Sequence, residues 1–233
     1  MELEHSFNIE PAGIASRRLF CVRSLFLYLR LLSGKNKMSK SIIEEKCGRC
    51  GKLHRMEFEG SVDALASPEA KEKVKSGEYF VWRCPECGCV NLVHGPFLYH
   101  DPQERLMILL TDAPVKAEGL PEGYTGRIVG SAGDLIEKIK IFDAGLDDVA
   151  VEMCKFVTLR EINKDVPLKF FKMDGADAEM TFTYPQDGQM EMISVGFNVY
   201  EDCAGILQRN PAIKEAARGL VKVDPDWLSN YIG

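Results

Sequence analysis

Two short cysteine motifs in the first half of the chain have the residue types and spacing of a metal site. They read Cys47-Gly48-Arg49-Cys50-Gly51 and Cys84-Pro85-Glu86-Cys87-Gly88. The spacing within each pair lets both sulfurs reach one ion from a single tight turn, and the glycine that follows can adopt the positive φ that folds the backbone under the metal. We therefore predict one four-thiolate site formed by Cys47, Cys50, Cys84 and Cys87.

Zinc is the metal that such a site most often holds in a structural role, and we expect one zinc ion. Iron is the alternative, because four thiolates in such turns also bind iron. A thioredoxin-type redox pair is disfavoured, since that motif opens a helix. The residues after Cys87 instead have the composition of a β-strand.

Three further groups could take part in chemistry. Cys89 is a candidate accessory ligand or redox thiol, but a cysteine at the start of a strand is more often a small buried residue. A basic rim around the first motif could bind an anion or nucleic acid, or could balance the thiolate charge, which we favour; it consists of Lys46, Arg49, Lys52 and Arg55. We interpret Tyr99-His100-Asp101 as a turn between two strands, because no nucleophile accompanies it. We therefore predict no catalytic residues.

The composition is that of a globular protein with one or two domains. The 233 residues carry a net charge of −6, which disfavours general binding to nucleic acids or anionic membranes. Eight cysteines, half of them in the two pairs, fit a metal site in a reducing compartment, so we expect a cytoplasmic protein. No uninterrupted apolar run reaches the length of a membrane span.

Residues 1–37 differ from the rest, with six basic and three acidic side chains around an apolar stretch. A signal peptide is disfavoured, because Arg23 and Arg30 interrupt that stretch and no small-residue cleavage site follows. An arginine-rich amphipathic surface anchor is a second interpretation. We favour the third, in which translation starts at Met38 and the upstream residues are an extension of the reading frame.

The expected fold class is α+β. Residues 38–118 predict a β-rich zinc ribbon with one inserted helix, which begins at Ser67-Pro68 and ends at Gly77. Residues 119–233 predict a second, α+β domain. It starts with a helical hairpin, capped by Ser131 and begun again at Asp147-Asp148, and continues as an antiparallel β-meander. Most acidic residues near helix starts, Glu152 among them, are explained by the helix dipole.

These motifs resemble the bacterial CpXC family, over roughly residues 46–165. The resemblance is carried by the two cysteine motifs, by Tyr99-His100-Asp101 before an apolar strand, and by Arg127-Ile128-Val129, Leu135-Ile136-Glu137-Lys138-Ile139 and Gly145-Leu146-Asp147-Asp148. The family is named for two Cys-Pro-x-Cys motifs, and Gly48 stands where the first proline would be. The resemblance implies the metal site and implies no reaction.

The function that we expect is therefore binding rather than catalysis. We favour a non-enzymatic adaptor that binds another protein. The alternatives are a thiol-redox or metal-dependent enzyme that uses Cys89, and a zinc ribbon that binds nucleic acid through the basic rim.

Overall fold

The structure, a computed structural model, describes residues 40–115, 120–175 and 178–232. Residues 1–37, with the predicted start at Met38, lie outside the described part. The strands are β1 (Lys40–Lys46), β2 (Leu53–Glu59), β3 (Ser61–Asp63), β4 (Val81–Arg83), β5 (Val90–Leu92), β6 (Phe97–Asp101), β7 (Leu106–Leu110), β8 (Thr125–Val129), β9 (Lys169–Asp174), β10 (Glu179–Gln186), β11 (Gln189–Gly196) and β12 (Leu220–Val221). The helices are α2 (Pro68–Ser76), η1 (Glu78–Phe80), α3 (Ala132–Asp143), α4 (Asp148–Glu161), α5 (Phe197–Arg209), α6 (Pro211–Ala216) and α7 (Pro225–Leu228).

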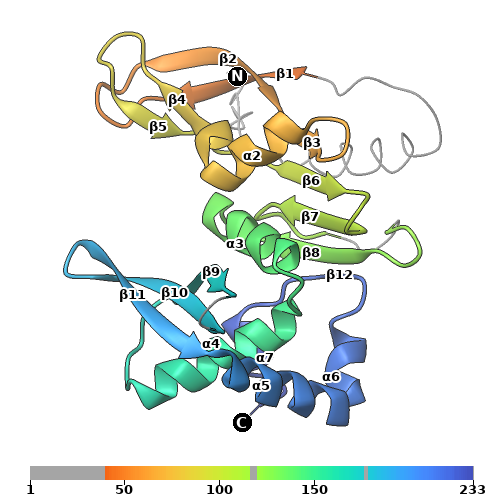
Figure 1. The fold of residues 1–233 in the computed structure, drawn as a ribbon. Helices are drawn as coiled ribbons and strands as arrows, with labels where there is room; N and C mark the ends of the chain where they lie inside the picture. Colours follow the sequence, from red (N-terminus) through yellow and green to blue (C-terminus); the bar gives the residue numbers. More distant parts are fainter. Residues whose placement is uncertain (1–39, 116–119, 176–177, 233) are drawn as a thin grey trace, which may run out of the picture.

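The two cysteine motifs form the turns of two antiparallel hairpins, β1–β2 and β4–β5, at one end of the molecule (Figure 1). Helix α2 is the predicted inserted helix. It has Pro68 in its first turn and ends at Gly77, whose φ of 84° is the left-handed conformation that commonly ends a helix. The predicted ribbon with an inserted helix is confirmed.

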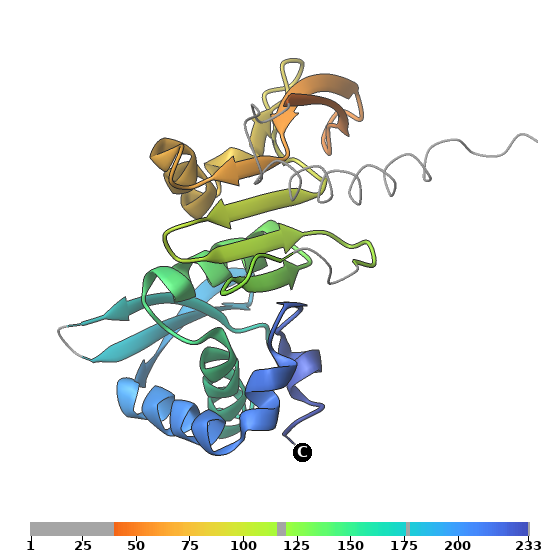
Figure 2. The same ribbon diagram turned by 90° about the vertical axis from the view of Figure 1, so that its right-hand side faces the viewer.

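A five-stranded mixed sheet in the order β12-β8-β7-β6-β3 lies next to the ribbon (Figure 2). All residues of β6 and β7 are buried, as the continuous apolar run of β7 predicts. The interpretation of Tyr99-His100-Asp101 as a turn is wrong, because these residues belong to β6. The turn lies one step later, where the Asp101 carboxylate accepts hydrogen bonds from the backbone N–H groups of Gln103 and Glu104.

Helices α3 and α4 follow β8 and have the predicted caps. Ser131 Oγ accepts a hydrogen bond from the Asp134 N–H, and the Asp147 carboxylate accepts from the N–H groups of Val149 and Ala150. These caps satisfy donors that have no partner within the helix. They fix where both helices begin, and therefore where the charged side chains of α3 and α4 lie.

The remaining strands form the predicted antiparallel meander, in the order β11-β10-β9. The alternation in β10 buries Met180, Phe182 and Tyr184 in a core that α4 and α5 share. Trp227 of α7 packs against the same core. The two-residue strand β12, which the sequence did not reveal, pairs with β8 and returns the end of the chain to the five-stranded sheet.

The predicted boundary at residues 118/119 lies between two paired strands, β7 and β8. The five-stranded sheet thus includes segments from both predicted domains, and the division stays a prediction about which parts unfold together. Within the described residues, no helix is both long enough and apolar enough to span a membrane.

Candidate metal centre

The two cysteine turns have the same backbone structure. In each, the glycine after the second cysteine donates its N–H to the carbonyl of the first cysteine, 2.9 Å away in both turns. Gly51 and Gly88 have φ values of 72° and 69°, as their position in the motif predicts. Each turn therefore presents two sulfurs on its inner side, and the neighbouring hairpins bring the two turns together.

The four sulfurs form one cluster. The Sγ atoms of Cys47, Cys50, Cys84 and Cys87 all lie within 4.8 Å of one another. The Cys47–Cys87 and Cys50–Cys84 separations are 3.6 and 3.7 Å. Tetrahedral zinc with Zn–S bonds of about 2.3 Å would need S–S separations of about 3.8 Å. The donors and their spacing therefore fit a four-coordinate ion, in which all positions are filled by protein.

The local environment shifts the pKa values of Cys47 and Cys87 in opposite directions. The backbone N–H of Cys50 lowers the pKa of Cys47 to about 6, together with the N–H of Arg49. For Cys87 the N–H of Cys89 acts in the same direction, but desolvation and the neighbouring sulfurs outweigh it and raise the pKa to about 12. The thiolate of Cys47 therefore forms readily, whereas the raised pKa values of Cys50 and Cys87 mean that binding of a metal there would release protons.

Side chains outside the predicted set hold the cluster in place. His54 Nε2 lies 3.3 Å from Cys84 Sγ. Asn91 accepts a hydrogen bond from the Gly48 N–H at 2.8 Å and donates to Cys47 Sγ at 3.7 Å. Lys52 and Glu86, one from each motif, form an ion pair at 2.6 Å. The sequence placed Lys52 in the basic rim but did not give its pairing with Glu86 or the contacts of His54 and Asn91, because these depend on how the hairpins face each other.

Cys89 lies outside the sulfur cluster. Its Sγ contacts the carbonyl of Val90 at 3.5 Å, and its side chain is partly exposed rather than buried as we expected. The other two described cysteines away from the motifs, Cys154 and Cys203, are buried in the core beneath the meander.

The basic rim is partly neutralised by acidic neighbours. Lys52 pairs with Glu86, and Arg55 pairs with Glu44 at 2.9 Å. Lys46 and Arg49 are exposed beside the first motif. Two of the four cations are therefore already engaged, which leaves a smaller positive surface than the sequence indicates.

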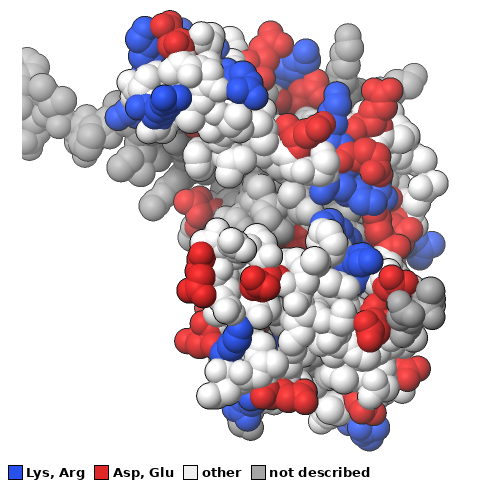
Figure 3. Space-filling model, turned by 60° about the vertical axis from the view of Figure 1, so that its left-hand side comes forward, with Lys and Arg blue, Asp and Glu red and all other residues white. Residues whose placement is uncertain are grey.

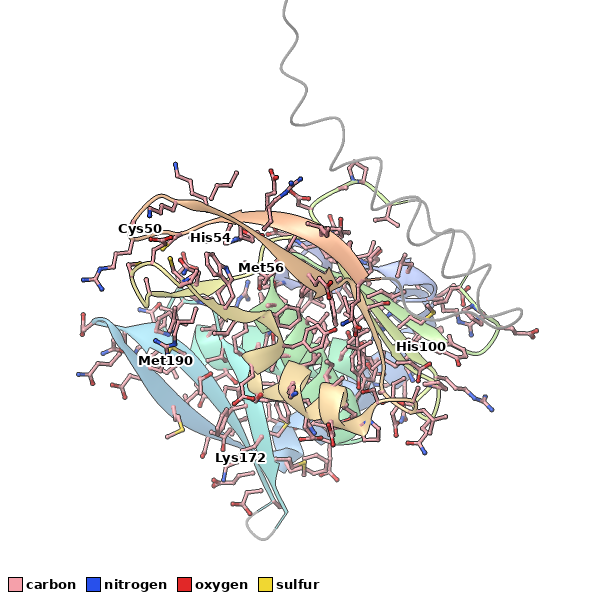
Figure 4. The ribbon with its side chains drawn as sticks, turned by 90° about the horizontal axis from the view of Figure 1, so that it is seen from above. Cys50, His54, Met56, His100, Lys172 and Met190 are labelled. Carbon is pink, nitrogen blue, oxygen red and sulfur yellow. The ribbon has the colours of Figure 1, made fainter. Side chains whose placement is uncertain are left out.

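The buried histidine of β6 lies far from the metal site. Figure 4 shows His100 across the molecule from Cys50 and His54. His100 Nδ1 is 3.0 Å from Asp63 Oδ2, and its Nε2 is 3.4 Å from the Tyr124 hydroxyl. Asp101 accepts hydrogen bonds from Lys71 and from the Tyr99 hydroxyl. These contacts join β3, α2 and β6.

A buried ionic cluster occupies the space between α3, α4 and the neighbouring strands. Asp148 binds Arg127 through two hydrogen bonds of 2.8 Å and accepts a third from Lys138 at 2.7 Å. Lys155 pairs with Glu137 and Glu152. The explanation of Asp148 and Glu152 by the helix dipole alone is therefore incomplete, because burial and direct ion pairs determine their environment.

Residues 46–155 match the model of the CpXC protein family. The match covers both cysteine motifs, the five-stranded sheet except β12, α3 and the first half of α4. Comparison with curated proteins and with solved structures found no match.

Proposed function

We propose that this chain, with its CpXC region at residues 46–155, is a zinc-dependent adaptor that binds another protein in the cytoplasm. In this proposal one zinc ion on Cys47, Cys50, Cys84 and Cys87 is structural and performs no catalysis. It holds the β4–β5 hairpin rigid, and the outer face of that hairpin contacts the partner.

The observation that carries the proposal is an apolar face beside the metal centre, which we call the hairpin face. It consists of Val81, Val90 and Leu92, with relative exposures of 44%, 53% and 54%. The register places Val81 opposite Leu92, and Val90 opposite Arg83, so all four side chains share one side of the hairpin. Neighbouring exposed apolar side chains are typical of interaction sites.

Charge and surface composition favour a protein over nucleic acid as the partner. Figure 3 shows an uncharged area on the upper part of the molecule, bordered by both basic and acidic side chains. Ion pairs engage Lys52 and Arg55 of the basic rim. A nucleic-acid site normally needs a larger excess of free cations.

The structural role of the metal is tested by metal content and thiol reactivity of the purified full chain. We expect one zinc per chain, four thiols that are protected from alkylation until a chelator is added, and a Cys89 that reacts without it. Bound iron would replace zinc in the proposal. A closed structural site would be contradicted if the purified chain held no metal. It would also be contradicted if one of the four cysteines were alkylated at once without a chelator.

The adaptor role is tested by proximity labelling and quantitative affinity purification from the native cell. The triple variant Val81→Ser/Val90→Ser/Leu92→Ser should lose the proteins that the unaltered chain enriches, while retaining its zinc. Leu65→Ser is the matched control, because Leu65 is 54% exposed but lies outside the hairpin face. An unchanged set of partners in the triple variant would refute the hairpin face as the docking site.

A further inference from the structure

A cavity of about 570 Å³ lies at the far edge of the five-stranded sheet, separate from the metal centre and from the hairpin face. The residues that line it come from β8 and the turn before it, from the start of α4, from α6 and from the segment that leads into β12. Its lining includes Tyr124, Arg127, Asp147, Lys214 and Arg218. This volume is within the range of sites for small molecules.

The inner wall of the cavity is a guanidinium group in a fixed orientation. Arg127 is only 5% exposed, and its Nε and Nη2 bind the carboxylate of Asp148. Its Nη1 donates to the carbonyls of Gly126 and Ala217, at 2.7 and 3.0 Å. The side chain is thus held in one orientation by β8, α4 and the residue that follows α6, through four of its five N–H donors.

The charges around the cavity have a positive excess. The single carboxylate of Asp148 is shared by Arg127 and Lys138. At the rim, Lys214 is exposed and makes no ion pair with any described residue, while Arg218 pairs with Glu215. Asp147 is the acid in the lining, and one of its oxygens already accepts from two N–H groups at the start of α4.

Polar groups other than charges also reach the cavity. The hydroxyl of Tyr124 lies 3.4 Å from His100 Nε2, so the ring is oriented by a buried partner. Gly123 and Gly219 line the opening with φ values of 77° and 82°. A side chain at either position would be strained, which keeps the mouth of the cavity open.

We propose that this cavity binds a small oxyanion, a phosphate group free or carried by a small metabolite. Lys214 and Arg218 would attract the anion to the rim, and the fixed cationic wall at Arg127 would stabilise it inside. Arginine and lysine recognise phosphate in proteins through charge-assisted hydrogen bonds.

The test is titration of the full chain with inorganic phosphate, at constant ionic strength set with chloride, followed by calorimetry and by amide resonances. We expect saturable binding at millimolar concentration, with shifts of the amide resonances of Tyr124 and Gly219. Lys214→Glu should weaken the affinity by about tenfold or more, since it reverses a charge at the rim. Glycerol phosphate should bind more tightly than inorganic phosphate if the natural ligand carries an organic part, and equally if it is the free ion.

Lys73→Glu is the matched control, because Lys73 is exposed on α2 and the substitution makes the same change of net charge. It should alter the affinity by less than about twofold. Arg218→Glu should weaken binding in the same way as Lys214→Glu, which provides a second variant at the rim. The proposal is overturned if binding of phosphate does not saturate up to about 20 mM. It is also overturned if Lys73→Glu weakens the affinity for phosphate as much as Lys214→Glu does.

Discussion

The sulfur atoms of the metal centre have polar neighbours that differ between the two motifs. Cys84 Sγ lies beside the ring of His54. Cys47 Sγ accepts a hydrogen bond from the side-chain amide of Asn91, whose oxygen accepts one from the Gly48 N–H. Outer groups of this kind orient metal ligands and offset the charge of thiolates. The ring of His54 is itself held against Trp82, with 5.4 Å between the ring centroids. The interior of the ribbon thus consists largely of polar and aromatic contacts that surround the sulfurs.

Loss of one ligand should unfold the ribbon. For Cys84→Ser we expect loss of the metal and of amide protection in β1, β2, β4 and β5, because structural zinc contributes on the order of 10 kcal/mol to folding. Zinc content and hydrogen exchange measure both effects. Cys89→Ser is the control and should retain metal and protection, since Cys89 lies outside the cluster. A Cys84→Ser chain with unaltered melting and exchange would contradict the structural role.

The pKa values of two buried carboxylates of α4, Asp148 and Glu152, are shifted in opposite directions. Although burial opposes ionisation of Asp148, the charges of Lys138 and Arg127 hold its pKa well below the ordinary value. Burial raises the pKa of Glu152, and its Oε1 has no hydrogen-bond partner within the described residues. Asp148 is thus stabilised as an anion, whereas burial of Glu152 outweighs the opposing charges of Lys155 and Lys138 and keeps its pKa above the ordinary value.

Asp148→Asn should therefore be costly, by about 3–5 kcal/mol, because it leaves Arg127 and Lys138 buried without their counter-charge. Chemical denaturation at neutral pH measures this free energy of unfolding. The contribution of Asp148 is present above its ordinary pKa and is lost as the pH falls further, so the difference from the unaltered chain should narrow in acid. A cost below about 1 kcal/mol at neutral pH would show that the ion pairs are not needed.

Glu152→Gln should have the opposite pH dependence. A raised pKa means that the folded state binds the proton more tightly, so stability is lost as the pH rises above the ordinary glutamate value. Glutamine carries no such penalty. We expect the variant to gain stability relative to the unaltered chain as the pH rises above the ordinary glutamate pKa of about 4.5, as measured by thermal melting at several pH values. A difference that is constant with pH would refute the assignment.

At the scale of elements, helix α3 joins the two halves of the molecule. Leu135 and Ile139 belong to the core under the five-stranded sheet, whereas Ile141 belongs to the core under the meander. Between these apolar positions, Glu137 and Lys138 carry the charges that meet α4. Because residues three and four apart share a face of a helix, one helix presents apolar surface to both cores and a polar surface between them.

The close approach of β12 to β8 depends on Gly126. A Cβ atom there would lie 2.9 Å from the Gly219 carbonyl, which is backbone and cannot move without disturbing β12. We expect Gly126→Ala to destabilise the chain by about 1–3 kcal/mol. Gly130→Ala is the matched control, because a Cβ at Gly130 meets no atom within 4 Å. Urea unfolding compares the two variants, and equal midpoints would contradict the packing argument.

The elements that the sequence predicted correctly are those with strong local signals. Ser131, Asp147 and Gly77 fixed helix ends through their own side chains or φ angles, and the alternation in β10 indicated its buried face. The cysteine cluster was predictable for the same reason, since each pair carries its own turn. The position of β6, the role of His54 and Asn91, and the ion pairs of Asp148 depend on contacts between distant segments, which periodicity and spacing do not encode.

At the scale of the whole molecule, the apolar residues separate into two main cores. Among the described residues, the buried members of the core under the meander begin at Ile141, whereas those of the core under the five-stranded sheet end at Ile139. Buried ion pairs, rather than a continuous apolar layer, fill much of the space between them. The free energy of a buried ion pair depends strongly on its geometry. The few ion pairs in this layer therefore help to fix the position of one core relative to the other.

Withdrawal of the metal should consequently affect the two ends unequally. Addition of a chelator should abolish amide protection in β1, β2, β4 and β5, while β9–β11, α4 and α5 remain protected, because their core lies in the other half. Hydrogen exchange with mass spectrometry resolves these segments. Equal loss of protection in β10 and β4 would show that the chain unfolds as one unit, and would also refute the predicted division into two domains.

The parallel pairing of β12 with β8 has a consequence during synthesis. Arg127 of β8 reaches the carbonyl of Ala217, a partner 90 residues later in the chain. At about 5–20 residues per second, a ribosome needs roughly 5–18 s to make that stretch. Until β12 has been made, the edge of β8 that does not pair with β7 lacks its partner strand and forms an open edge of the sheet. The nascent chain therefore has a window in which chaperones, or a neighbouring nascent chain, compete with its own last strand.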